Sequence, residues 1–125
     1  MIDHVGIQCA DVGASRAFYE ALLAPLEMAP AMEPAPNVVG FFGPRPGSFW
    51  LGPAERGETR ELHVAFHART RAEVRAFHDV AVAFGAEILH APRVFPEYHP
   101  TYYGAFVRDP DGHNVEAVCH EDTDA

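Results

Sequence analysis

Two histidines and one glutamate have the residue types and the sequence positions of a metal site. His4 and His63 each open a segment that alternates like a strand, and Glu116 stands between Val115 and Ala117 in an otherwise apolar segment. A buried carboxylate must be paired, hydrogen-bonded or bound to a metal, because its bare desolvation is prohibitive. Two imidazoles and a carboxylate suit Fe(II), Zn, Ni, Mn or Co, and three protein ligands leave positions open for water or substrate. We therefore predict one divalent metal at these three residues; the alternative is that Glu116 simply faces water.

Further groups that could move protons stand before the last pair of expected strands. His99, Tyr102 and Tyr103 lie close to Gly104 in sequence. An imidazole or a phenol hydroxyl near an open metal site can act as a general acid or base. Both tyrosines remain candidates, since adjacent strand residues face opposite sides and the sequence does not say which one points inward. His113 falls in a turn and is expected to be solvated.

Three residues are predicted to contact a substrate. Trp50 and Phe49 would form an apolar wall if they point into a pocket, since pockets are typically lined by aromatic side chains with few polar groups. His67 lies four residues after His63 on the same strand face, about 13 Å away at about 3.3 Å per residue. We expect His67 to hold substrate at the rim of the cleft and not to share the metal.

The strands and helices that must position these residues follow a repeated pattern. A strand over 2–9 precedes a helix capped by Asp11, and a strand over 62–66 precedes a helix capped by Thr70 that ends at Gly85. The two segments coincide when the chain is shifted by about 59 residues, which indicates an internal duplication. The matched pairs include His4-Val5 with His63-Val64 and Arg16-Ala17-Phe18 with Arg75-Ala76-Phe77.

Three short strands are expected after each helix. They cover about 27–31, 37–43 and 48–51 in the first half, and 87–90, 102–108 and 114–118 in the second half. The last two form a hairpin around the turn Asp109-Pro110-Asp111-Gly112. The proline-rich stretches 30–36, 44–53 and 92–100 are expected to be loops, which either border a cavity or serve as plain connectors.

We therefore predict an α+β fold of two paired βαβββ modules, which form a cupped mixed sheet around a metal-binding cleft. The modules span about 1–55 and 60–120 of a single domain, 1–125.

Composition narrows the possible partners. The formal net charge is −9 and the chain has no lysine, which argues against nucleic acid, because a phosphate-binding face needs clustered positive charge. No apolar run reaches membrane-spanning length, and the first residues lack the pattern of a signal peptide. We expect a soluble, cytoplasmic protein that binds a small molecule and no membrane.

The whole pattern resembles the vicinal oxygen chelate superfamily. The resemblance rests on the paired βαβββ halves, the strand-opening His4 and His63, and the ending Asp-Pro-Asp-Gly-His-Asn-Val-Glu over 109–116. That group includes glyoxalase I, extradiol dioxygenases, fosfomycin-resistance enzymes and bleomycin-binding proteins. The resemblance implies that the two histidines and Glu116 bind a divalent metal and that a substrate chelates it through two neighbouring oxygens. It also implies a homodimer.

One departure from the pattern bears on the reaction. Glyoxalase I carries a fourth, carboxylate ligand on the last strand of its first half, where this chain has Ser48-Phe49-Trp50-Leu51. We expect a metal-dependent, glyoxalase-like isomerase or lyase acting on a small oxygen-rich substrate. The alternatives are an Fe(II) ring-cleaving dioxygenase and a non-catalytic protein that binds a small molecule or antibiotic.

Overall fold

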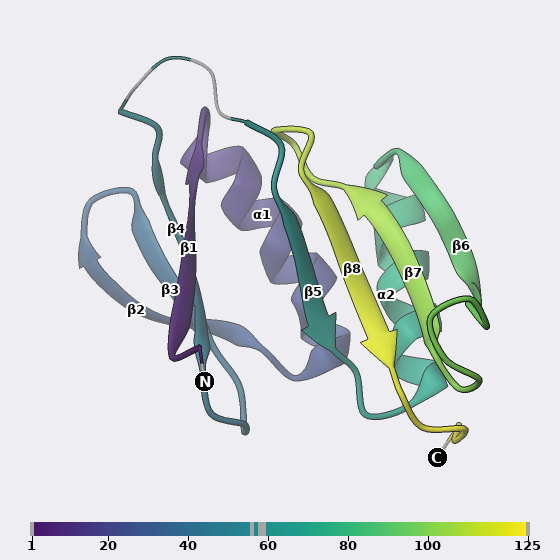
Figure 1. Cartoon of the computed structure of the whole chain (residues 1–125). Coiled ribbons are helices and arrows are strands. Elements are labelled where there is room, and N and C mark those ends of the chain that lie inside the picture. Colours follow the sequence, from purple (N-terminus) through teal and green to yellow (C-terminus); the bar gives the residue numbers. More distant parts are fainter. Residues whose placement is uncertain (1, 56, 58–59, 125) are drawn as a thin grey trace. The chain divides into compact units, whose positions relative to one another are not determined.

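The computed structural model describes residues 2–55, 57 and 60–124, which divide into two compact units, Met1–Arg60 and Glu61–Ala125. Each unit has the order βαβββ (Figure 1). Unit 1 contains β1 (His4–Cys9), α1 (Val12–Leu23), a 3₁₀ turn (Ala24–Leu26), β2 (Ala29–Ala35), β3 (Val38–Phe42) and β4 (Ser48–Pro53). Unit 2 contains β5 (His63–His67), α2 (Arg71–Phe84), β6 (Ile88–Val94), β7 (Tyr103–Arg108) and β8 (Asn114–Cys119). The predicted α+β class and the two βαβββ modules are confirmed. Among the described helices, none is long and apolar enough to cross a membrane.

Both helices begin at the predicted caps. The Asp11 carboxylate accepts a hydrogen bond from the Ala14 amide at 3.0 Å, and the Thr70 hydroxyl oxygen accepts one from the Glu73 amide at 3.1 Å. The Glu73 carboxylate reaches back to the amide of Arg69 at 2.7 Å, one residue earlier than a capping box requires. Each cap satisfies amide groups that the first helical turn leaves without intrahelical partners.

The two sheets have the same topology. The strand orders are β1-β4-β3-β2 and β5-β8-β7-β6, so the first strand of each unit pairs with its last strand. These first-to-last pairs are parallel, whereas the other neighbours are antiparallel. His4 lies opposite Ser48, and His63 lies opposite Asn114. The two histidines therefore occupy equivalent positions in the two units.

The proline-rich stretches correct part of the prediction. Most of 30–36 forms strand β2 instead of a loop, and Pro92 lies inside β6. Both strands are at an edge of their sheets, where a residue without an amide hydrogen is tolerated. Register shifts interrupt the pairing of β2 with β3 and of β6 with β7. Proline predicts a loop because it lacks an amide hydrogen, but an edge strand tolerates this loss.

One face of each sheet packs against the helix of the same unit. In unit 1 this core contains Ile7, Phe41, Phe49 and Leu51 on the strands and Tyr19 and Leu22 on α1, all buried. In unit 2 it contains Val107, Val115 and Ala117 with Val74 and Phe77 of α2. Because successive strand residues face opposite sides, Glu116 points away from the face that holds its two apolar neighbours.

Candidate functional site

Glu116 is the centre of a polar cluster in unit 2. Only 1% of its surface is exposed, although it carries a carboxylate. One carboxylate oxygen, Oε1, lies 3.1 Å from Nε2 of His63 on the neighbouring strand. The other oxygen, Oε2, accepts a hydrogen bond from the hydroxyl of Tyr102. Three residues predicted from the sequence are thus joined by direct contacts through Glu116. His63 comes from β5, Glu116 from β8, and Tyr102 immediately precedes β7.

The hydrogen-bond partners of His63 indicate which of its two ring nitrogens carries the proton. Nδ1 lies 3.1 Å from the carbonyl oxygen of Asn114, which can only accept, so Nδ1 carries a proton. In the neutral imidazole, Nε2 then has no proton, and the contact with Glu116 holds one proton between the two groups. A ring whose second nitrogen donates to a backbone carbonyl is the usual arrangement for a histidine that binds metal.

Burial sets the acid–base properties of the pair. It raises the pKa of the Glu116 carboxyl above its usual range, while the hydrogen bond from Tyr102 and the neighbouring His63 act in the opposite direction. Burial and the Glu116 carboxylate also raise the pKa of the Tyr102 hydroxyl well above its ordinary value. Tyr102 therefore keeps its proton at neutral pH and acts as a donor toward Glu116.

A second pair of histidines lies beside Tyr102. The Thr101 amide donates to Nδ1 of His99 at 3.2 Å, so a neutral His99 carries its proton on Nε2. That nitrogen lies 2.8 Å from Nδ1 of His120 and donates to it. The ring of Tyr102 is 5.4 Å from each imidazole, centre to centre, and the ring of His67 is 6.1 Å from that of His120. His99 and His67 thus lie near the cluster, and His120, which follows Glu116 by four residues as His67 follows His63, joins them.

Aromatic rings surround the carboxylate on this face of the sheet. Phe106 stacks on His63 with the ring centres 5.9 Å apart, and His90 meets Phe106 at 5.3 Å. Phe95 contacts Phe106 at 5.3 Å and Tyr102 at 6.1 Å. Tyr102, from the segment between β6 and β7, and Phe106, the register partner of Glu116, thus lie beside the buried carboxylate and belong to this group of rings. The sequence could not place His90 or Phe95, since their contacts depend on the pairing of β6 with β7 and on how the segment between these strands folds back.

The structure decides one open alternative in unit 2 and corrects one expectation. Of the two candidate tyrosines, Tyr103 is not directed at Glu116: its ring lies under the Arg71 guanidinium, 4.9 Å away, and its hydroxyl bonds to Arg75 of the same helix. The alternation of strand residues places it on the helix-facing side. His113 is 1% exposed and not solvated, because its Nδ1 accepts a hydrogen bond from the Leu62 amide at 3.0 Å.

His4 has the same proton arrangement in unit 1 as His63 has in unit 2. Its Nδ1 lies 2.7 Å from Oδ1 of Asp3, so this nitrogen donates and Nε2 is left without a proton in the neutral ring. Within unit 2, the described residues bring no third histidine, cysteine, aspartate or glutamate to His63 and Glu116 at metal-binding distance. The residues His63 and Glu116 supply one nitrogen and one oxygen donor, a pair that suits a divalent transition metal.

The position that corresponds to Glu116 in unit 1 is occupied by Trp50. Trp50 is the register partner of Gly6, and Glu116 is the register partner of Ala65. Gly6 and Ala65 stand two residues after the equivalent histidines. Strand β4 thus carries the indole of Trp50 at the position where β8 of unit 2 carries the carboxylate of Glu116.

Phe49 does not line a pocket together with Trp50. It is 1% exposed and packs in the core of unit 1, with its ring centre 4.8 Å from that of Tyr19 and 6.2 Å from that of Phe41. Two consecutive strand residues face opposite sides, so the predicted wall could contain only one of the pair. Trp50 is the residue on the face away from α1.

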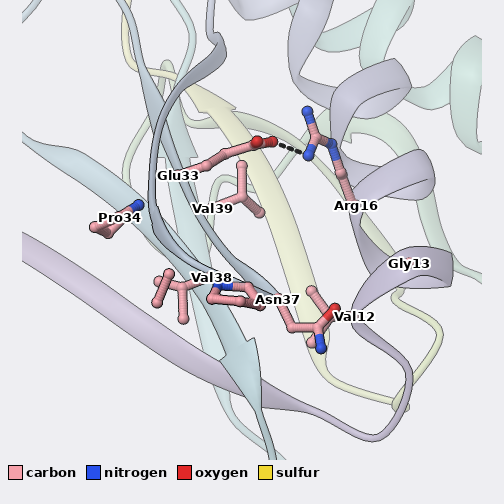
Figure 2. A pocket seen from close by; sticks show the side chains of 10 residues that line it. Val12, Gly13, Arg16, Glu33, Pro34, Asn37, Val38 and Val39 are labelled. Atoms are coloured by element: carbon pink, nitrogen blue, oxygen red, sulfur yellow. Dashed lines mark hydrogen bonds and ion pairs between the residues drawn. The ribbon is translucent and has the colours of Figure 1, made fainter.

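Unit 1 also contains an open pocket of about 550 Å³ between the start of α1 and the hairpin of β2 and β3. Figure 2 shows Arg16 of α1 and Glu33 of β2 joined by an ion pair beside it. Val12, Val38 and Val39 supply apolar walls. None of the residues predicted to do chemistry lines this pocket, and its two charged side chains neutralise each other.

Comparisons with known proteins point to one family. The family model described as Glyoxalase/Bleomycin resistance protein/Dioxygenase superfamily matches residues 1–117. Among curated protein sequences, none matches the chain.

Solved structures resemble the chain over almost its whole length. A glyoxalase/bleomycin resistance protein from Albidiferax ferrireducens T118 is 26% identical with a TM-score of 0.83, and the alignment covers 95% of this chain and 98% of that one. A lactoylglutathione lyase from Agrobacterium tumefaciens is 21% identical with a TM-score of 0.72, covering 95% and 92%. A glyoxalase/dioxygenase from Nostoc punctiforme is 23% identical with a TM-score of 0.70, covering 95% and 90%. At the lower identities the likeness extends to the fold alone.

Proposed function

The chain belongs to the glyoxalase/bleomycin resistance protein/dioxygenase superfamily, and we propose that it is a metal-dependent, glyoxalase-like isomerase or lyase within it. The substrate is a small oxygen-rich molecule that places two neighbouring oxygens on a divalent metal. The observation that carries the proposal is the buried contact of Glu116 with His63 at 3.1 Å. A buried carboxylate with a raised pKa next to a correctly oriented imidazole is expected at a functional site.

The donor atoms suit a metal better than a structural role alone. The contact between Nε2 of His63 and Oε1 of Glu116 is complete only when one proton lies between them, and a divalent cation can take the place of that proton. We propose His4 as the third donor, since its Nδ1 is held by Asp3 and its Nε2 is left to bind. Its equivalence to His63 supports this assignment.

The residues around the pair provide the acid–base chemistry. A bound metal supplies Lewis-acid stabilisation of an oxyanion that develops on the substrate. Tyr102 holds a proton on its hydroxyl at neutral pH and directs it at Oε2 of Glu116. We assign Tyr102 as the group that orients Glu116 for this chemistry, and His99, which is hydrogen-bonded to His120, as the neighbouring general acid or base.

Metal content tests the proposal first. Protein purified without added metal is analysed by mass spectrometry beside the His4→Ala, His63→Ala and Glu116→Gln variants. We expect about one equivalent of Zn, Ni, Mn or Co in the native protein and its loss in each variant. The His78→Ala variant is the control, because His78 lies on α2. If the native protein takes up no metal when each ion is offered, the proposed site is wrong.

Proton transfer is tested by isotope exchange. Small hydroxy-carbonyl compounds are incubated in D₂O with metal-loaded protein, and NMR follows exchange at the carbon beside the carbonyl group. We expect exchange that stops on chelation and that falls about 100-fold or more in Tyr102→Phe. Oxygen consumption with an aromatic diol in the iron-loaded protein would instead indicate the dioxygenase. Stoichiometric ligand binding that survives chelation, without turnover, would indicate a binding protein.

A further inference from the structure

The indole ring of Trp50 is fixed flat against the sheet of unit 1. A Cβ atom built on Gly40 would lie 2.7–2.8 Å from three atoms of the six-membered ring, so the ring covers this glycine directly. The indole Nε1 donates to the hydroxyl oxygen of Ser48 at 2.9 Å. Phe42 meets the ring edge to face, with the centres 5.8 Å apart and the planes at 81°. Three neighbours therefore hold the ring in one orientation.

The sheet surface beside the ring is accessible at Gly6. In the sheet, Trp50 has Gly6 as its register partner on β1 and Gly40 as its partner on β3. Gly40 is buried under the indole, whereas Gly6 is exposed and Trp50 keeps part of its surface accessible. In unit 2, the corresponding partners of Glu116 are Ala65 and Phe106, both with side chains. The glycines in unit 1 thus leave room for an indole and for a further flat group next to it.

We propose that Trp50 and the exposed strip around Gly6 bind a planar aromatic ring of a small molecule. Aromatic rings stack with offset faces at centre separations of about 4.5–7 Å, which requires one flat, accessible ring face. The fixed indole supplies such a surface without losing freedom when the ligand binds, because its orientation is already set. Binding at this site depends on unit 1 alone. That the bound molecule is also the substrate rests on the proposed function and narrows its class to oxygen-substituted aromatic compounds.

The chain offers a direct reporter for this site. Trp50 is its single tryptophan, so ¹H–¹⁵N NMR gives one indole N–H signal, and the amide of Gly6 provides a second. Protein stripped of metal by a chelator is titrated with catechol and, separately, with cyclohexane-1,2-diol. The two probes carry the same pair of neighbouring oxygens and differ in the planarity of the ring. We expect catechol to shift both signals saturably and the saturated diol to bind at least about 10-fold more weakly.

Two glycine variants test whether ring binding requires the present position of the Trp50 indole or responds to any change in the sheet. Gly40→Ala adds a methyl group that meets the indole and displaces it, and we expect catechol to bind at least about 10-fold more weakly. Gly52→Ala on β4 is the matched control, since its added atom meets nothing within 4 Å and its binding should match the native protein. Trp50→Leu, read at the Gly6 amide, should lose the catechol response. The number of dispersed amide signals shows whether each variant remains folded.

The outcomes distinguish this site from the metal site. The proposal that Trp50 binds a planar ring would be overturned by any of three results. These are equal binding of the two diols, no saturable shift with catechol, and native binding in Gly40→Ala. A response to tetramethylammonium as strong as that to catechol would also overturn it, in favour of a cation site. All titrations use metal-free protein, so failure of the proposed metal site leaves them unaffected. Conversely, loss of ring binding leaves the metal content of the purified protein unchanged.

Discussion

The Tyr102 hydroxyl donates a hydrogen bond to Oε2 of Glu116, and Gly104 makes this contact possible. A Cβ atom on Gly104 would lie 3.1 Å from that same oxygen and 3.4 Å from Cε1 of the Tyr102 ring. The glycine therefore leaves the space in which the phenol and the carboxylate meet. This arrangement fixes one oxygen of Glu116 and leaves the other to His63, which is the basis of the predictions for unit 2.

Replacing Tyr102 by phenylalanine should weaken metal binding by about 10–100-fold, because the hydroxyl orients a proposed ligand. Competition against a coloured chelator measures the affinity for zinc. Tyr103→Phe is the matched control, since Tyr103 lies under Arg71 on the other side of the same strand. Equal losses in the two variants would contradict the assignment of Tyr102.

Gly104→Ala should lower the affinity for zinc about 10-fold without unfolding the protein. The added methyl group forces Oε2 of Glu116 or the Tyr102 ring to move by a few tenths of an ångström. The backbone of Gly104 is not in the left-handed region, so alanine adds no backbone strain. The same chelator competition provides the affinity, and thermal unfolding provides the stability. An unchanged affinity would show that the carboxylate does not need its present position.

Glu116→Gln should stabilise the metal-free protein at neutral pH. The folded-state pKa of Glu116 is raised above the ordinary value of 4.5, so the folded protein binds more protons than the unfolded chain as the pH rises. Its contribution is fully favourable below the ordinary pKa and is lost as the pH rises through the folded-state pKa. Glutamine has no such loss, and its amide can donate to His63 while its oxygen accepts from Tyr102.

Urea unfolding of the chelated native and Glu116→Gln proteins at several pH values measures this difference. The unfolding midpoint of the variant should exceed that of the native protein by an amount that grows from acidic to neutral pH. A gap that is constant with pH, or that shrinks as the pH rises, would mean that burial does not raise the pKa of this carboxyl.

Gly85→Ala should destabilise unit 2 by about 1 kcal/mol. Gly85 ends α2 in the left-handed region, with φ of 82°, and its amide bonds to the last carbonyls of the helix. Alanine there is strained although it has open space around it. Gly52→Ala in β4 also meets open space but is outside the left-handed region, and it should be close to neutral. Chemical denaturation of both variants tests whether strain, and not crowding, causes the loss.

Local patterns in the sequence were sufficient for the fold. The alternation in β1 and β5 and the caps Asp11 and Thr70 depend on neighbouring residues only, and the shift that aligns the two halves needs only a comparison of two sequence segments. Together these signals predict two βαβββ modules. The same patterns singled out His63 and Glu116, since a charged residue in an apolar strand needs a partner. The full extent of edge strand β2 could not be predicted, because its position at the edge of the sheet, which makes its prolines tolerable, is set by the order of all four strands.

Side-chain direction and partners were decided by tertiary structure alone. The choice of Tyr102 over Tyr103, the burial of Phe49 and His113, and the covering of Gly40 by Trp50 all depend on strand register and on loops that fold back. A shift of one residue in register would reverse every side chain in a strand. The sequence by itself thus determined which elements form and which residues could do chemistry. The packing of strands distant in sequence determined which of those residues meet, because contact depends on three-dimensional position and not on residue type.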